Sequence, residues 1–180
     1  MRDDVDRTRI ETFLRALGST FRHPGRLYLA GGESMVWRGL RGATRDVDIA
    51  YDVAPAHVEE WVRAIRDLKE RLCINVEEAD PSHFVPLPPG AASRAEFVGR
   101  FGAVDVFLYD PYSIALGKLA RGRARDLADV RALLDAGVLV ATRLETLTGA
   151  ALTRGGDRSL RFDPERVRRH LRRVLTQPGD

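Results

Sequence analysis

The alternation of apolar and polar residues along the chain predicts short strands interspersed with amphipathic helices. Residues of about 4–17 carry apolar side chains at near-helical spacing, and Gly18 is expected to end this helix. Residues 47–51 alternate apolar and acidic or small side chains, as in a strand with one buried face. The same criteria predict strands at 27–30, 74–76 and 104–109, and helices from near 33 and at 55–72, 111–121, 124–136, 141–151 and 163–175.

This order of elements predicts an α/β (α+β) fold in which helices flank a small mixed sheet. We expect residues 1–136 to form the sheet-bearing domain. Residues 137–180 are expected to form a C-terminal helical extension packed on the same domain, with a break at Gly155-Gly156. Residues 81–92, which contain four prolines, are expected to form a loop.

Composition narrows the class of protein. Apolar residues make up 44% of the 180 residues, which is enough for a core, but no apolar run approaches a membrane span. The charged N-terminus lacks the apolar segment of a secretory signal, and the single Cys73 cannot form an internal disulfide, so we expect a cytoplasmic protein without a membrane partner. Only two of the 29 basic residues are lysines, Lys69 and Lys118, which draws attention to both.

Two short motifs carry the candidate chemistry. Asp46 and Asp48 stand two apart on a predicted strand, so both carboxylates emerge on one face. Carboxylates held this close repel each other unless a cation lies between them, and hard oxygen ligands suit Mg²⁺ or Mn²⁺. Gly31-Gly32 separates a strand from a helix, where the backbone can approach a phosphate closely.

Together these motifs resemble the hG[G/S]…Dh[D/E]h signature of the DNA polymerase β-like nucleotidyltransferases. The resemblance implies an enzyme that moves a nucleoside monophosphate from an NTP to an acceptor hydroxyl, with Gly31, Gly32 and the nearby hydroxyl of Ser34 as nucleotide contacts. Glu33 departs from the pattern, since many relatives carry Thr or Ser there. Members of this superfamily add a third metal-binding carboxylate from a later strand. We favour Asp105 for that role, and Glu77 is the competing candidate.

A second segment, Lys118-Leu119-Ala120-Arg121 followed by Arg125-Asp126-x-x-Asp129, resembles a motif of abortive-infection (AbiEii-like) toxin nucleotidyltransferases. The resemblance spans about residues 27–136. It implies catalytic roles for Lys118 and Asp126 and places Lys118 and Arg121 on the triphosphate. The alternative is that Lys118 and Arg121 are surface residues and that Arg125 and Asp129 form an i,i+4 ion pair.

The only indication of the acceptor substrate in the sequence is a cluster of positive charge near the C-terminal end. Residues 154–173 hold eight arginines and three acids, a stripe that could bind the backbone of tRNA or other RNA or could be an ordinary solvated helix face. The leading hypothesis is a toxin of a toxin–antitoxin or phage-defence system with a cognate antitoxin protein as partner. A non-catalytic nucleic-acid- or antitoxin-binding module and a small-molecule or protein nucleotidyltransferase remain alternatives. The four histidines (His23, His57, His83 and His170) show no ligand spacing and are assigned no chemistry.

Overall fold

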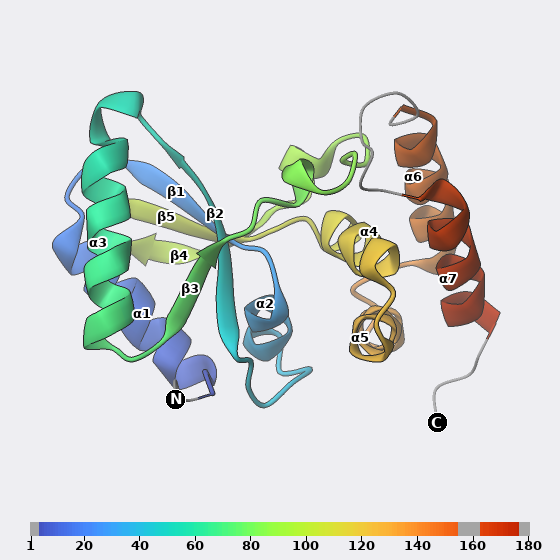
Figure 1. Ribbon diagram of the computed structural model, residues 1–180, viewed down its shortest axis with the longest axis horizontal. Coiled ribbons are helices and arrows are strands. Elements are labelled where there is room, and N and C mark those ends of the chain that lie inside the picture. The colour runs from blue at the N-terminus through green and yellow to red at the C-terminus, as the bar shows by residue number, and fades with distance from the viewer. Residues whose placement is uncertain (1–3, 155–162, 177–180) are drawn as a thin grey trace. The chain divides into compact units, whose positions relative to one another are not determined.

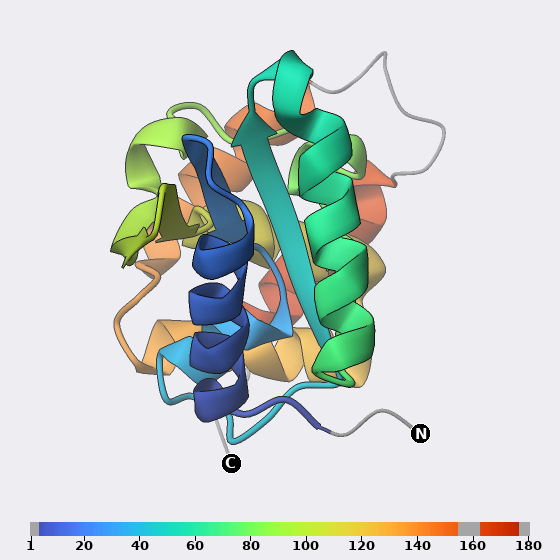
Figure 2. The same cartoon turned by 90° about the vertical axis from the view of Figure 1, so that its left-hand side faces the viewer.

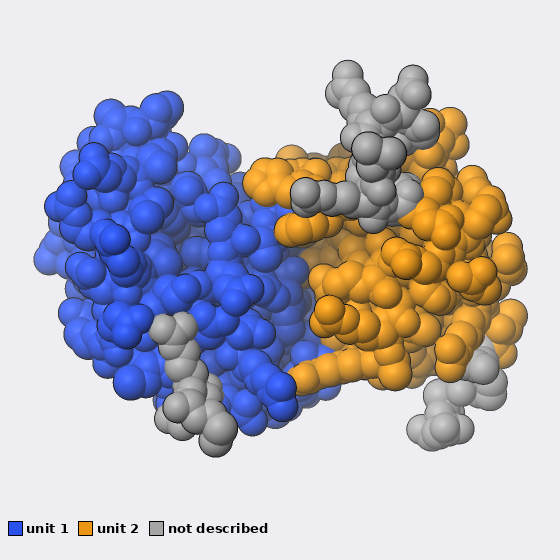
Figure 3. Space-filling model, in the orientation of Figure 1, with its two compact units in different colours: residues 1–80, 95–109 blue, residues 81–94, 110–180 orange. Residues whose placement is uncertain are grey.

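The computed structural model describes residues 4–154 and 163–176, which belong to two compact units. Unit 1 comprises Met1–Asp80 and Ala95–Tyr109, and unit 2 comprises Pro81–Arg94 and Asp110–Asp180 (Figure 3). The predicted break at Gly155-Gly156 lies outside the described residues.

Unit 1 is built on a five-stranded mixed sheet in the order β3-β2-β1-β5-β4. The strands are β1 (Gly25–Leu29), β2 (Asp46–Val53), β3 (Asn75–Glu78), β4 (Glu96–Phe101) and β5 (Val104–Leu108). Strand β1 runs antiparallel to β2 and parallel to β5, while β2 is parallel to β3 and β4 is antiparallel to β5. The strand β4 was not predicted from the sequence, because a bulge between Phe97 and Gly99 interrupts its alternation.

Helices α1 (Arg7–Thr20) and α3 (Val58–Arg71) cover one face of this sheet, and the short α2 (Gly32–Trp37) packs against β2 (Figure 1, Figure 2). A single 3₁₀ turn, η1 (Pro55–His57), precedes α3. The core contains the apolar faces of the two long helices and the inward side chains of the strands, among them Phe13, Leu17, Leu27, Leu29, Val47, Ile49, Trp61, Leu68 and Val106. The polar residues that alternate with them are therefore on the opposite face of the sheet.

Gly18 has a different role from the one expected. It does not end α1, which continues to Thr20. A Cβ atom at Gly18 would lie 2.4 Å from the backbone carbonyl of Phe101, so the missing side chain lets the turn between β4 and β5 pass close to the helix. At its start α1 is capped by Asp6, whose carboxylate accepts a hydrogen bond of 2.9 Å from the Arg9 N–H.

The described residues of unit 2 form two 3₁₀ turns and four helices: η2 (Pro81–His83), η3 (Ala91–Arg94), α4 (Pro111–Arg121), α5 (Ala124–Asp135), α6 (Ala141–Arg154) and α7 (Pro164–Thr176). Helix α4 packs against α5, α6 and α7. Its N-cap, Asp110, accepts hydrogen bonds from the N–H groups of Tyr112 and Ser113. It also accepts hydrogen bonds of 2.8 Å from Nε and Nη2 of Arg94.

The predicted fold class is confirmed: a five-stranded mixed sheet flanked by helices, with helices at the C-terminal end. The compact units group α4 and α5 with the later helices, whereas residues 111–136 are expected from the sequence in the first domain. Among residues 4–154 and 163–176, none of the helices has the length and apolar character needed to cross a membrane.

Candidate active site

Asp46 and Asp48 lie on β2 with their side chains on the sheet face opposite α1 and α3. The alternation decides this, because Val47 and Ile49 between and beyond them belong to the core. Both aspartates are partly buried. The predicted same-face arrangement of the two carboxylates is therefore present in the structure, whereas metal binding by them stays a prediction.

Gly31 brings the glycine loop into contact with this acidic pair. The Ala30 N–H donates to the Asp48 carbonyl at 2.9 Å, which continues the pairing of β1 with β2 beyond the end of β1. A Cβ atom on Gly31 would lie 1.9 Å from Asp48 Oδ2, so only glycine leaves room for the carboxylate. Next to it, a Cβ atom on Gly32 would lie 2.6 Å from Thr44 Oγ1 and 2.9 Å from an Arg41 guanidinium nitrogen.

The third carboxylate that the structure brings to this pair is Glu77. Strand β3 neighbours β2, and the parallel register places Glu77 beside Asp48 and Asn75 beside Asp46. The Asn75 side-chain amide donates to Asp46 Oδ1 at 2.8 Å and to Glu77 Oε1 at 2.6 Å. One amide nitrogen thus touches two of the three carboxylates. The sequence signal for this arrangement was the two-residue spacing of Asn75 and Glu77, which is the same as that of Asp46 and Asp48.

Asp105, the favoured candidate, lies at the other end of the sheet, and this placement is a correction. It pairs in register with Arg26 of β1, and Arg26 pairs with Asp52 of β2. Since Asp52 is four residues beyond Asp48, the separation along the strands is about 13 Å. Asp105 instead accepts two hydrogen bonds from Arg100, at 2.6 and 3.0 Å, and these bonds lower the pKa of its carboxyl group.

Glu33 is a fully buried carboxyl group that joins the glycine loop to β2. Its Oε1 accepts a hydrogen bond of 2.6 Å from the Gly31 N–H, and its Oε2 accepts one of 3.2 Å from the Asp48 N–H. Burial and the nearby Asp48 charge raise its pKa from 4.5 to about 8, although the backbone donors act in the opposite direction. The sequence showed only that Glu33 departs from the family pattern, because burial of a charged residue type is not visible in a local pattern.

The raised pKa of Glu33 predicts a pH-dependent stability. A carboxyl group that binds its proton more tightly in the folded state stabilises that state fully below pH 4.5, and this contribution is lost as pH rises to about 8. In chelator-treated protein, we expect the unfolding free energy of wild type relative to Glu33→Gln to fall over this window. The slope should approach about 1.4 kcal/mol per pH unit at most.

Urea titrations of both proteins between pH 4 and 9 would measure this difference. The glutamine variant loses one acceptor for a backbone N–H at every pH, so its constant offset does not imitate the slope. Parallel stability curves for the two proteins would contradict the prediction.

The Ser34 side chain faces the interior of the protein. Its hydroxyl donates to the Gly31 carbonyl at 2.7 Å, and the residue is 2% exposed. The structure therefore places this hydroxyl inside the glycine loop, where it stabilises the turn. Its predicted contact with a nucleotide would require that hydrogen bond to break.

Lys118 and Asp126 belong to a buried ion-pair network within unit 2. Lys118 is only 3% exposed, so the alternative that it is a surface residue is wrong. Its Nζ lies 2.6 Å from Asp129 Oδ2 and 3.9 Å from Asp126 Oδ1, and the more exposed Arg121 donates to Asp126 at 2.8 Å. Burial raises the pKa of Asp126, but hydrogen bonding and charge from Arg121 and the charge of Lys118 outweigh it and lower the pKa. Contact of Lys118, Arg121 or Asp126 with a triphosphate stays a prediction.

The C-terminal arginine stripe is partly described. On α7 the arginines at 168, 169, 172 and 173 are exposed, while Val167, Leu171 and Val174 are buried. Arg168 pairs with Glu165. Arg158 and Arg161 lie outside the described residues. The helix therefore presents a basic face, as the sequence indicated.

Comparison with known proteins supports the nucleotidyltransferase prediction at the level of the family. Residues 9–157 match the family described as "Nucleotidyltransferase of unknown function (DUF6036)". Comparisons with curated proteins and with solved structures gave no match. The family match covers the glycine loop, the three carboxylates on β2 and β3, and the α4–α5 segment. Because it spans most of the 180 residues, the chain belongs to this family of nucleotidyltransferases of unknown function.

Proposed function

We propose that this chain is a Mg²⁺-dependent nucleotidyltransferase that transfers a nucleoside monophosphate from an NTP to an acceptor hydroxyl. The observation that carries the proposal is the grouping of Asp46, Asp48 and Glu77 on one face of two paired strands, with Gly31 in contact with Asp48. Membership of a nucleotidyltransferase family supports the reaction type.

The donor set fits a hard divalent cation. Three carboxylates on neighbouring strands supply the oxygen ligands that Mg²⁺ and Mn²⁺ prefer. The Asn75 amide, which donates to Asp46 and Glu77 at once, indicates that these two groups converge on a common point. Bound there, the metal would polarise the phosphate and neutralise charge that develops on the leaving pyrophosphate.

The remaining groups of unit 1 would orient the nucleotide. Gly31 lets backbone and substrate approach Asp48 closely, and Glu33 fixes this loop against β2 through two backbone N–H groups. The Arg41 guanidinium beside Gly32 supplies positive charge next to the loop. In the reaction the acceptor oxygen bonds to the α-phosphorus, the bond to the β-phosphate oxygen breaks, pyrophosphate leaves, and the hydroxyl proton passes to solvent. Alignment and electrostatic stabilisation are the main contributions of the protein.

RNA, including tRNA, is the acceptor class that we propose. The basic face of α7 supports it, because exposed arginines at helical spacing suit a phosphate backbone. A toxin role, with a cognate antitoxin as partner, is supported only by the resemblance of the Lys118–Asp129 segment to AbiEii-like toxins. These two proposals are separable from the transfer reaction itself.

The experiment is incubation of the protein with each of the four α-labelled NTPs, Mg²⁺ or Mn²⁺, and total RNA. Radioactivity should enter an RNA band with one or two of the NTPs, and EDTA should abolish it. Label on the protein itself would identify protein as acceptor. If the protein binds RNA but no product is labelled with any NTP and either metal, the non-catalytic binding module becomes the better hypothesis.

A further inference from the structure

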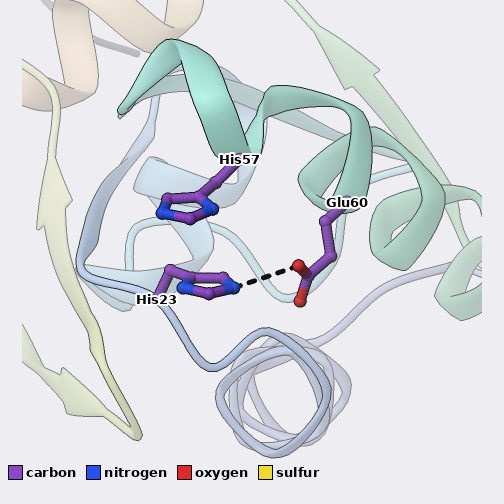
Figure 4. Close-up of side chains that lie close together, drawn as sticks. All are labelled: His23, His57 and Glu60. Carbon is purple, nitrogen blue, oxygen red and sulfur yellow. Dashed lines mark hydrogen bonds and ion pairs between the residues drawn. The ribbon is translucent and has the colours of Figure 1, made fainter.

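Three side chains without an assigned role meet at the end of the sheet away from the glycine loop. His23 lies in the connection between α1 and β1, His57 ends η1, and Glu60 lies in the first turn of α3 (Figure 4). The topology brings them together, because Gly25 at the start of β1 is paired with Val53 at the end of β2. The chain therefore enters β1 and leaves β2 at the same place. Sequence spacing could not reveal this cluster.

The geometry of the cluster is compact. His23 Nε2 lies 3.0 Å from Glu60 Oε2, and the two imidazole rings are stacked with centroids 3.6 Å apart at 7°. One ligand atom from each of the three residues lies within 4.8 Å of the others. Both histidines are half-buried and Glu60 is exposed, so the cluster is backed by protein and open to solvent on one side.

We propose that His23, His57 and Glu60 form a binding site for a borderline-soft divalent transition metal of the Zn²⁺ class. Two imidazoles and a carboxylate are an established ligand set for zinc with open positions, and imidazole selects such metals over Mg²⁺. The hydrogen bond between His23 and Glu60 already holds two of the ligand groups close together. A bound cation would take the place of the proton in this hydrogen bond. This site is separate from the acidic triad in residues and in chemistry, so it does not rest on the proposed transfer reaction.

Metal binding requires one small rearrangement. Ligand atoms on a tetrahedral zinc ion lie about 3.4 Å apart, given bonds of about 2.1 Å. Because the lone pair of an imidazole nitrogen lies in the ring plane, two parallel stacked rings cannot both point at one ion. One ring must therefore turn about its Cβ–Cγ bond, which breaks the stacking. The rings of His23 and Phe21 pack in a T-shaped arrangement, and Phe21 packs against the fully buried Trp61, so the site is attached to the core of unit 1.

The consequence is a metal-dependent link between two segments of the chain. His23 belongs to the segment that follows α1, whereas His57 and Glu60 belong to the start of α3. A cation shared by them would couple these segments and shift the folding equilibrium toward the native state.

The test is calorimetric titration of Zn²⁺ into the full chain, prepared without a histidine tag and kept in excess Mg²⁺ to occupy the acidic triad. We expect one equivalent of Zn²⁺ to bind wild type and to raise its melting temperature. His23→Gln and His57→Gln should each weaken the affinity at least about tenfold. In parallel, Co²⁺ should give the visible absorption of a low-symmetry site in wild type and lose it in both variants.

Three matched variants decide whether the signal belongs to this site. His83→Gln makes the same substitution at an exposed histidine of unit 2, Glu77→Gln removes an acid of the triad, and Cys73→Ser removes the exposed thiol. All three should bind Zn²⁺ as wild type does. The proposal is overturned if wild type shows no saturable binding in excess Mg²⁺. It is equally overturned if affinity is lost in Glu77→Gln or Cys73→Ser and kept in both cluster variants. Melting curves of the metal-free variants verify that they fold.

Discussion

Glu77→Gln is expected to reduce nucleotidyl transfer by about 100-fold or more, whereas Asp105→Asn should leave the rate within about threefold. Both changes remove one carboxylate charge with little change in shape. Glu77 stands beside Asp48 in the β2–β3 register, while Asp105 is paired with Arg100 at the other end of the sheet. Only the first loss should therefore affect a cation held by the acidic triad.

The comparison is well controlled because neither change should unfold the protein. Glutamine at 77 keeps a carbonyl oxygen that can accept the hydrogen bond from Asn75. Asp105 is in an exposed ion pair, whose loss costs little stability. Single-turnover rates at saturating NTP, together with Mn²⁺ titrations of each variant, would measure the effect. An inactive Asp105→Asn beside an active Glu77→Gln would mean that the reaction takes place at the Arg26–Asp105 end of the sheet.

Lys118→Met should destabilise the protein by about 3–5 kcal/mol. The ammonium group is buried against Asp129 at 2.6 Å, and its removal leaves the buried carboxylates of Asp129 and Asp126 without that cation. Methionine fills a similar volume, so the loss reports charge rather than a cavity. Urea titration at neutral pH would measure it.

Arg121→Met is the matched control for this prediction. Arg121 also pairs with Asp126, but its side chain is 54% exposed, so its loss should cost no more than about 1 kcal/mol. Similar stability for both variants would contradict a structural role of Lys118. NTP affinity per folded molecule tests the separate prediction from the toxin resemblance: weaker binding in folded Lys118→Met would support contact with the triphosphate, and unchanged binding would refute it.

Local pattern was sufficient for much of the fold. Helix α4 begins at Pro111 and ends at Arg121, as predicted, because an aspartate cap, a proline in the first turn and a glycine at the end act on neighbouring residues. The glycine loop and the same-face placement of Asp46 and Asp48 could be predicted for the same reason, since strand alternation has a period of two residues. The strand β4 was not predicted, because its bulge interrupts the two-residue period.

What the sequence determined by itself was the list of chemical groups and their local geometry: a strand, a glycine pair, a helix and an acidic strand in that order. Only the tertiary structure decided which distant groups join them. The sequence favoured Asp105 over Glu77 as the third carboxylate, and the sheet order β3-β2-β1-β5-β4 reversed this preference by placing Glu77 beside Asp48. The burial of Glu33 and Lys118 and the meeting of His23 with His57 also depend on strand pairing and helix packing. Such contacts join residues far apart in sequence, and no short-range periodicity encodes them.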